Sequence, residues 1–365
     1  MIRLLIIINL FLLLSCKDKK NAVLVAPTNI NLQNINERKL ESFIPSFLDD
    51  KNISYINLDL QNGQRIKSVS KVVLGDSAIF VSDFKQNCIF IFDKDGKWRE
   101  TLSARSINLS KIHDFQINGN ILTVLDAKAD VLKVYVLDIK PKLIETIKPD
   151  YEFSSFYQLE KGGFLVYTSP WNAKNLDVLM STNHNLKPEK TYFERDFKED
   201  ESYMLSTNDI YPFNGEIYYS FPSFNKLVSF DKNGSINNIY NFDFNQNIPA
   251  KYLSNLEKYK NELQKYRFIN GYSFITDSLI IGDIANGLNQ PKAFYYNRAS
   301  NTMEIEKSKF SSILSNKVGS SDSAVISALY PGQYQVLKDI PSIPEYVKSC
   351  LQNEHYVLCI VKIRN

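Results

Sequence analysis

Few side chains in this sequence have the type and spacing of a catalytic set. His113 stands directly before Asp114 at the start of an apolar run, where an imidazole could serve as a base or a ligand. Three other carboxylates, those of Asp83, Asp126 and Asp283, each close an apolar run. Because these three recur at one position of a repeated pattern, we expect them to cap backbone amides. The sequence holds no Gly-x-Ser-x-Gly, His-Glu-x-x-His or phosphate-binding glycine motif, so we assign no catalytic residue.

The histidines and cysteines do not predict a metal site, a cofactor or a disulfide framework. Three histidines in 365 residues are too few and too scattered for a site built on imidazoles. Cys88 and Cys359 fall in apolar, strand-like runs, and Cys350 falls in an expected helix. We therefore expect three free, buried thiols and no bound metal or cofactor.

Aromatic side chains lie beside asparagine in several of the expected loops. Such pairs could stack on a sugar or hold a peptide. The candidate ligand-binding residues are Trp171, Asn172, Phe224, Asn225, Tyr330, Tyr334 and His113. The alternative is that the aromatic side chains pack beneath their own loops, and that His113 is a hydrogen-bonded structural residue.

A repeated β pattern has to position these side chains. Residues 78–102 read as three consecutive antiparallel strands, and the second strand of each repeat ends at an equivalent position. These positions are Asp83, Asp126, Thr168, Ser220, Asp283 and Ala328, separated by 43, 42, 52, 63 and 45 residues. A period of this length with strand patterning is typical of propeller blades. The sequence therefore predicts an all-β, six-bladed β-propeller over residues 53–365.

The last blade is expected to borrow its fourth strand from the N-terminal side. Five fourth strands are visible for six blades, and the chain ends just after the final third strand. Residues 53–60 supply the missing strand best and would lie beside residues 355–363, closing the ring. Within the blades, Asp95-Gly96 and Asn233-Gly234 predict two-residue type I′ hairpin turns.

Two insertions hold most of the excess loop length. Residues 249–266, between blades four and five, place Tyr252, Leu256, Tyr259, Leu263 and Tyr266 on one stripe of an expected helix. Residues 330–353, inside blade six, include a second expected helix near Pro344–Leu351. An up-and-down blade order puts both insertions on one face, and we expect that face to bind the ligand. The striped helix could pack on the propeller, dock a partner or act as a lid.

The N-terminus has the features of an exported, lipid-anchored protein. Arg3 precedes an apolar run too short to span a membrane, and Leu13-Leu14-Ser15-Cys16 has the pattern of a bacterial lipobox. We expect a signal peptide over residues 1–15, lipidation at Cys16, and a polar tether over residues 16–52, in which Glu37–Leu48 could form a short helix or lie along the domain. An ordinary cleaved signal with a chance cysteine is the alternative.

The charge balance gives no reason to expect a nucleic-acid partner. Lys and Arg number 43 against 40 Asp and Glu, and the sequence has no clustered basic stretch. The expected partners are the membrane, through the lipid, and an unidentified protein, peptide or glycan.

The lipobox, the SDF…IFIFDKDGKW blade and the C-terminal HYVLCIVKI together resemble one family. The chain is similar to six-bladed β-propeller lipoproteins of Gram-negative bacteria, with an NHL-like or TolB-like propeller. The resemblance covers roughly residues 54–365 and implies an outer-membrane lipoprotein on the periplasmic or the cell-surface side. The function of most members is unknown, so the resemblance implies a cellular location and a fold but no catalytic or binding chemistry.

Three functions remain open from the sequence. The first is a non-catalytic binding module that holds a peptide, protein or glycan on the long-loop face. The second is a hydrolase or lyase that acts at the channel mouth near His113. The third is a structural subunit of an envelope complex, with the tyrosine-striped helix as its docking element.

Overall fold

The computed structural model describes most of the chain after residue 24. The described ranges are 25–60, 64–126, 131–138, 140–168, 177–194, 210–221, 225–244, 248–256, 258–287, 289–308 and 310–363. The expected signal peptide and Cys16 lie outside these ranges. Across the described ranges, no helix combines the length and the apolar composition needed to cross a bilayer.

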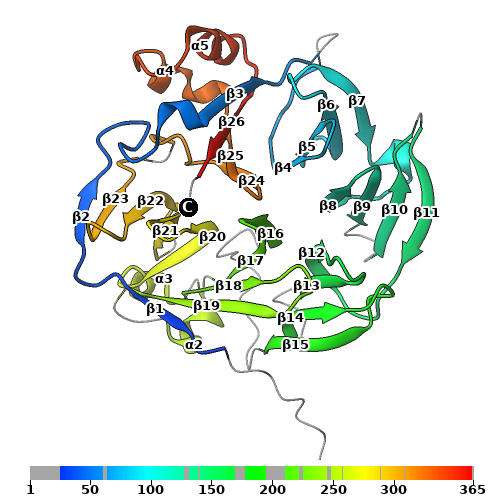
Figure 1. Ribbon diagram of the computed structural model, residues 1–365, viewed down its shortest axis with the longest axis horizontal. Helices are drawn as coiled ribbons and strands as arrows, with labels where there is room; N and C mark the ends of the chain where they lie inside the picture. Colours follow the sequence, from blue (N-terminus) through cyan, green and yellow to red (C-terminus); the bar gives the residue numbers. More distant parts are fainter. Residues whose placement is uncertain are drawn as a thin grey trace, which may run out of the picture.

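Six antiparallel sheets stand around a central axis, as the sequence predicts (Figure 1). Blade one contains β4 (Lys71–Leu74), β5 (Ile79–Asp83), β6 (Cys88–Phe92) and β7 (Trp98–Ser103). Blade two contains β8 (Ile112–Asn118), β9 (Ile121–Asp126), β10 (Val131–Val136) and β11 (Lys142–Ile147). Blade three contains β12 (Phe153–Gln158), β13 (Phe164–Thr168), β14 (Asp177–Thr182) and β15 (Pro188–Glu194).

The remaining blades follow the same order from the axis outward. Blade four contains β16 (Ile210–Phe213), β17 (Glu216–Phe221), β18 (Lys226–Phe230) and β19 (Ile236–Asp243). Blade five contains β20 (Arg267–Ile275), β21 (Leu279–Asn286), β22 (Lys292–Asn297) and β23 (Thr302–Ile305). Blade six contains β24 (Lys317–Ser321), β25 (Ala324–Leu329), β26 (Val357–Lys362) and the early strand β3 (Ile53–Asn57).

The predicted ring closure is confirmed. β3 pairs antiparallel with β26, in a register that runs from Ile53 opposite Val361 to Asn57 opposite Val357. On the other side of blade six, β24 packs against β4 so closely that Gly319 leaves no room for a side chain. A β-carbon added there would lie 2.3 Å from the carbonyl oxygen of Val72. The C-terminal strands of blade six are therefore joined on both sides to strands from the N-terminal part of the chain.

In its described part, the segment expected to be a polar tether lies along the propeller, which is the alternative that the sequence left open for residues 37–48. β1 (Thr28–Asn31) pairs in parallel with β19, and β2 (Asn36–Lys39) pairs in parallel with β23. A short 3-10 helix, η1 (Asp50–Asn52), then leads into β3. Residues 28–57, which we name the N-terminal belt, run along the outside of blades four, five and six (Figure 1). Unpaired backbone groups of outer strands are strong hydrogen-bonding sites, so even short polar segments can add to them.

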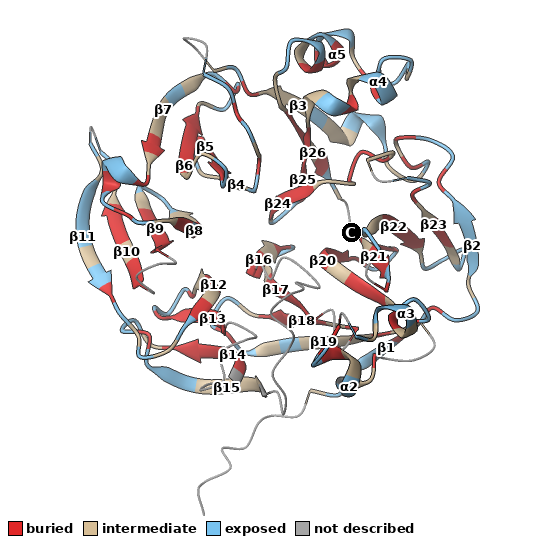
Figure 2. Cartoon of the chain, turned by 180° about the vertical axis from the view of Figure 1, so that it is seen from behind, coloured by how far each residue is buried: buried red, intermediate tan, exposed pale blue. Residues whose placement is uncertain are grey.

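The core lies between neighbouring blades. The second and third strands are almost wholly buried, whereas the outermost strands of blades one and two are largely exposed or half-buried (Figure 2). In β5 and β6, all ten residues are buried, because their two faces pack against the sheets on either side. This two-sided burial explains why these strands read as continuous apolar runs and not as alternating ones.

Two of the repeated carboxylates, those of Asp83 and Asp126, have the structural role that the sequence predicts. Asp83 accepts hydrogen bonds from the amides of Lys67 and Ser68, and Asp126 accepts them from Ser110 and Lys111. These amides belong to the segments that lead into the first strands of blades one and two. Asp283 makes an ion pair, in which its Oδ1 lies 2.6 Å from the buried ammonium of Lys317 in the next blade.

The predicted turn type at the two aspartate-containing hairpins is wrong. A type I′ turn needs positive φ at both central residues, but only Gly96 (φ 86°) and Gly234 (φ 85°) have it. In each hairpin the leading aspartate, Asp93 or Asp231, accepts two backbone amides of its own turn. That side-chain bonding favours a turn with one extra residue, in which only the glycine is left-handed.

The two insertions are helical, and in the meander order both connect strand ends on one face of the ring. The first contains two short helices, α2 (Ala250–Leu253) and α3 (Lys260–Leu263), where one continuous helix was expected. The second contains η4 (Pro331–Gln333), α4 (Tyr334–Leu337) and α5 (Glu345–Gln352), and α5 confirms the predicted helix within one residue. In the first insertion, Leu256 and Leu263 are buried against blade five, which favours packing over partner docking.

Candidate functional site

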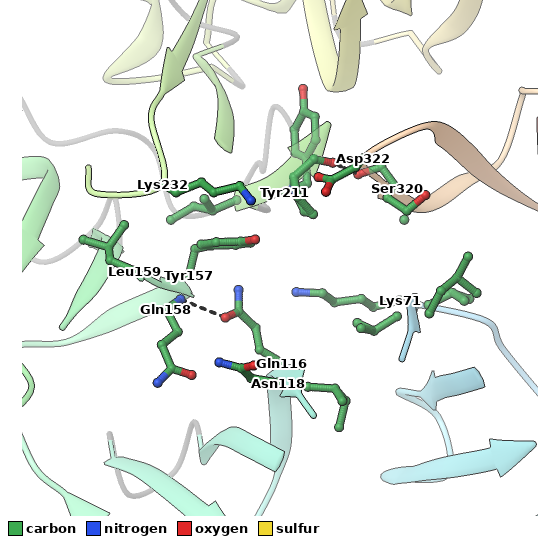
Figure 3. Close-up of a pocket in the computed structure, with 18 of the residues that line it drawn as sticks. Lys71, Gln116, Asn118, Tyr157, Gln158, Leu159, Tyr211, Lys232, Ser320 and Asp322 are labelled. Atoms are coloured by element: carbon green, nitrogen blue, oxygen red, sulfur yellow. Dashed lines mark hydrogen bonds between the residues drawn. The ribbon is translucent and has the colours of Figure 1, made fainter. Parts of the chain in front are cut away.

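A pocket of about 370 Å³ occupies the central channel (Figure 3). Residues from the innermost strands of all six blades line it. These are Lys71 to Leu74, Gln116 to Asn118, Tyr157 to Glu160, Ile210 to Pro212, Tyr272 and Gly319 to Asp322, together with Lys232 from a hairpin of blade four. The volume falls in the range of pockets that bind small molecules.

The channel is asymmetric because two of its inner strands touch. β16 of blade four contacts β24 of blade six, and the amide of Asn214 donates to the carbonyl oxygen of Asp322 at 3.0 Å. The Ser320 hydroxyl also donates to the Pro212 carbonyl oxygen. These bonds join blades four and six, which are not neighbours in the ring, and among the described lining residues blade five contributes only Tyr272, whereas blades one, two and three contribute most of the wall.

The pocket opens on the face opposite to the long insertions. Leu74, Asn118 and Asp322 stand at or just beyond the carboxyl ends of inner strands, where the short first-to-second turns lie. The helical insertions connect strands at the other ends. The pocket therefore lies on the face that carries the short turns, whereas the sequence favoured the long-loop face as the binding face because of loop length alone.

A chain of polar contacts forms one wall and links four blades. Lys71 Nζ lies 2.5 Å from Asp114 Oδ1, and both side chains are shielded from solvent. Asp114 Oδ2 accepts from the Ser155 hydroxyl at 3.1 Å, and the Ser155 oxygen accepts the amide of Ile210 at 3.2 Å. Since Lys71 lies opposite a carboxylate, its positive charge is compensated within the wall.

A second pair of contacts fixes the amide side chain of Gln116. Its Oε1 accepts the backbone amide of Gln158 at 2.8 Å (Figure 3). Its Nε2 donates to the carbonyl oxygen of Phe156 at 3.0 Å. Both partners are in β12, so Gln116 ties blade two to blade three. The fixed amide gives the pocket a rigid polar edge.

The rim near blade four is also paired. Lys232 Nζ lies 3.2 Å from Glu160 Oε1, and the Glu160 amide donates to the Lys232 carbonyl oxygen at 2.9 Å. Behind this rim, the Tyr211 hydroxyl donates to the Ser273 carbonyl oxygen at 2.6 Å. The hairpin of blade four is thereby held against blade three.

The side chains of Tyr157 and Asp322 differ from the lining groups above, because no hydrogen-bond or ion-pair partner is found for either among the described residues. The Tyr157 side chain points into the middle of the pocket, with Lys71 and Lys232 reaching in from other sides (Figure 3). Burial, followed by the charges of Asp322 and Glu160, raises the pKa of Tyr157 to about 12. Its hydroxyl thus stays protonated at neutral pH and can donate a hydrogen bond.

The sequence-predicted binding residues do not gather in this pocket. Trp171, Asn172 and Phe224 lie outside the described residues. Asn225 is buried: its Oδ1 accepts the Ile269 amide at 3.1 Å, and its Nδ2 donates to the Arg267 carbonyl oxygen at 3.1 Å. Asn225 therefore joins blade four to blade five. Its side chain could turn toward a ligand only by breaking both of these hydrogen bonds.

The other candidates lie away from the pocket as well. Tyr330 packs edge-on against Phe310, with ring centroids 4.8 Å apart, and Tyr334 packs against the core. His113 is exposed and stands five residues before Asn118 in β8, roughly 16 Å along the strand from the pocket rim. Its neighbour Asp114, and not His113, provides the buried polar group of this strand.

The described residues contain no group of three or more histidine, cysteine or acidic side chains placed to hold a metal ion. The three thiols of Cys88, Cys350 and Cys359 are unpaired, as the sequence predicts, but Cys350 is only half-buried where a buried thiol was expected.

The propeller also relates the chain to known proteins. Residues 19–312 match the model of a family described as the 6-bladed beta-propeller family. The chain belongs to this family. The match extends across the N-terminal belt and blades one to five, so the 6-bladed beta-propeller family includes the strands that wrap the ring. No curated protein matches the chain.

Solved structures agree with the fold of the 6-bladed beta-propeller family. A candidate exported protein of Bacteroides fragilis NCTC 9343 superposes with a TM-score of 0.70 at 13% identity, covering 93% of this chain and 100% of its own. A virginiamycin B lyase from Staphylococcus aureus gives a TM-score of 0.43 at 11% identity, covering 86% of this chain and 100% of its own. The first similarity supports the propeller architecture, and the second carries no functional weight.

Proposed function

We propose that this chain is a lipid-anchored protein of the bacterial envelope that binds the end of a short peptide in its central channel. The observation that carries the proposal is the pocket of about 370 Å³ on the short-turn face, with walls drawn from all six blades. A pocket assembled from rigid inner strands holds its shape before the ligand arrives, which reduces the entropic cost of binding.

The pocket walls suit a peptide because they alternate apolar and amide-bearing residues. Val73, Leu74 and Ile117 offer apolar surface, and Asn118 and Gln158 offer amide groups. A peptide presents the same two features, apolar side chains and a backbone with regularly spaced donors and acceptors.

Binding is favoured over chemistry because the pocket's polar groups serve the architecture. Lys71 faces Asp114, and Gln116 is held by two backbone groups of blade three. None of the described lining residues is a histidine or a cysteine. Tyr157 and Asp322 are the exceptions, and a phenol and a carboxylate suit hydrogen bonding to a ligand, so we propose a receptor-like role.

The proposed address rests on the N-terminal sequence. Arg3, the apolar run and the Ser15-Cys16 step have the order of a lipoprotein signal, and lipidation at Cys16 would anchor the protein to the outer membrane. The structurally similar protein of Bacteroides fragilis is itself named as exported, in keeping with this address. Replacing Cys16 with Ser should abolish incorporation of a labelled fatty acid and release the protein from membranes.

Hydrogen–deuterium exchange tests the site. The full-length protein, solubilised in detergent, is measured with and without a pool of synthetic tripeptides. Protection is expected at the carboxyl ends of β8, β12 and β24, where the pocket opens. Protection confined to residues 330–353 would instead place binding on the long-loop face and contradict the proposal.

A further inference from the structure

We infer that the pocket receives the amino terminus of its peptide, with the Asp322 carboxylate as the partner of the α-ammonium group. This inference rests on the proposed function and specifies which end of the peptide is recognised. It follows from the charges of the pocket, from the position of Asp322 and from the free hydroxyl beside it.

The first argument is the pairing of charges. Four of the described lining residues are charged, namely Lys71, Glu160, Lys232 and Asp322. Lys71 pairs with Asp114 at 2.5 Å, and Lys232 pairs with Glu160 at 3.2 Å. Among these described groups, Asp322 alone lacks an oppositely charged partner. With two cations and three carboxylates, the site keeps an excess of one negative charge, which attracts a cation.

The second argument is the rigidity of the turn that bears Asp322. Its carbonyl oxygen accepts the Asn214 amide at 3.0 Å, and the next residue, Ser323, accepts the Ile363 amide at 3.2 Å. Two residues earlier, Ser320 is bonded to Pro212 across the channel. The backbone on either side of Asp322 is therefore fixed, while its side chain remains exposed at the pocket. A carboxylate on a fixed backbone loses less entropy when it binds an ammonium group than one on a mobile loop.

The third argument is the hydroxyl of Tyr157. Among the described residues, no hydrogen-bond partner is found for this group, and it points into the pocket (Figure 3). Burial is the main cause of the raised pKa of Tyr157, and the charge of Asp322 adds to it, so the two groups lie within electrostatic range of each other. An amino-terminal residue carries its ammonium group and its carbonyl group on the same α-carbon. Asp322 can accept from the first and Tyr157 can donate to the second.

The alternative orientation is disfavoured by the same groups. A carboxyl terminus would need an uncommitted cation, but both lysine ammonium groups already face carboxylates. It would also meet the Asp322 charge directly, and like charges repel at close range.

Isothermal titration calorimetry of the full-length protein in detergent tests the inference with matched probes. The probes are a randomised tripeptide pool with free amino ends and amidated carboxyl ends, and the same pool acetylated at the amino end. We expect acetylation to weaken binding roughly tenfold or more, the effect expected for loss of a charge-assisted hydrogen bond. Asp322→Asn should reduce the affinity for the free pool by a similar factor and leave the acetylated pool unchanged.

The control variant is Asp76→Asn. Asp76 is an exposed aspartate in the first-to-second turn of blade one, on the same face but outside the pocket. This variant removes the same charge and should leave both affinities unchanged. A folding defect would appear as a lowered melting temperature, which is measured for both variants.

The outcomes separate the two levels of the account. Equal binding of both pools, with no effect of Asp322→Asn, overturns the amino-terminal inference while the proposed function survives. Failure of both pools to bind overturns the proposed function as well. If glucosamine oligomers bind and peptides do not, a glycan amine is the ligand and the peptide inference is wrong.

Discussion

The α-carbon of Gly96 lies so close to the carbonyl oxygen of Asn57 that an added β-carbon would stand 2.0 Å from it. Gly96 ends the outer hairpin of blade one, and Asn57 ends the strand that completes blade six. The Asp59 amide also donates to the Gly96 carbonyl oxygen at 3.0 Å, and the Trp98 amide donates to the Asp59 carbonyl oxygen at 3.1 Å. The hairpin of blade one is therefore hydrogen-bonded to the segment at the end of the closing strand. This close approach of blade one to blade six requires a glycine at position 96.

Gly96→Ala is predicted to destabilise the protein more than a matched glycine variant elsewhere. Gly215, in the Asn214-Gly215 turn, also has positive φ but has open space around its α-carbon. Gly215→Ala should cost about 1 to 2 kcal/mol for the left-handed backbone. Gly96→Ala should cost about 1 to 3 kcal/mol more, because the methyl group also collides with Asn57. Urea unfolding measures the free energy of unfolding of both variants. Equal losses would mean that the contact between Gly96 and Asn57 does not stabilise the closed ring.

The thiols should react in an order set by burial. Cys88 and Cys359 are buried in strands, whereas Cys350 on α5 is half-buried. Burial raises the pKa of Cys88 to about 12, and it raises the pKa of Cys359 as well. In the native protein at pH 8, a disulfide reagent should therefore label Cys350 first. Mass spectrometry of the labelled peptides checks the order, and rapid modification of Cys359 would contradict the packing of blade six.

The free energy of unfolding should fall at alkaline pH. In the folded state, burial raises the pKa of Cys88 and of Tyr135 to about 12, from ordinary values of 9.0 and 10.0. A raised folded-state pKa stabilises the protein fully below the ordinary value, and the contribution is lost as pH rises toward the folded value. Stability should thus be flat from pH 7 to about pH 9 and then decline toward pH 12. Tyr135→Phe should make the decline shallower, and an unchanged slope would contradict the argument.

The sequence predicted the ring because the information is local and repeated. Each blade carries its own apolar strands, and the missing fourth strand could be counted, so residues 53–57 were found without the structure. The sequence did not predict β1 and β2, because their sequences, TNIN and NERK, contain almost no buried positions. Such segments are held by backbone hydrogen bonds to an outer strand, and these bonds leave no hydrophobic pattern to recognise.

The pocket could not be found from motifs for a different reason. Its residues are spread from Lys71 to Asp322, and which inner strands touch depends on the closure of the whole ring. The contact between β16 and β24 decides where the channel stays open, and no local sequence reports it. One signal was available, since Asn118, Glu160 and Asp322 all stand just where a first strand ends. Loop length on the other face obscured it.

The most direct test of the account is to fill the pocket from its rim. Asn118 is an exposed lining residue at the end of β8, so Asn118→Trp adds bulk at the mouth without disturbing the core. The account predicts that the melting temperature stays unchanged, while the affinity for the free tripeptide pool falls at least about tenfold through steric exclusion. A variant that binds these peptides as tightly as the parent protein would show that the channel is not the binding site.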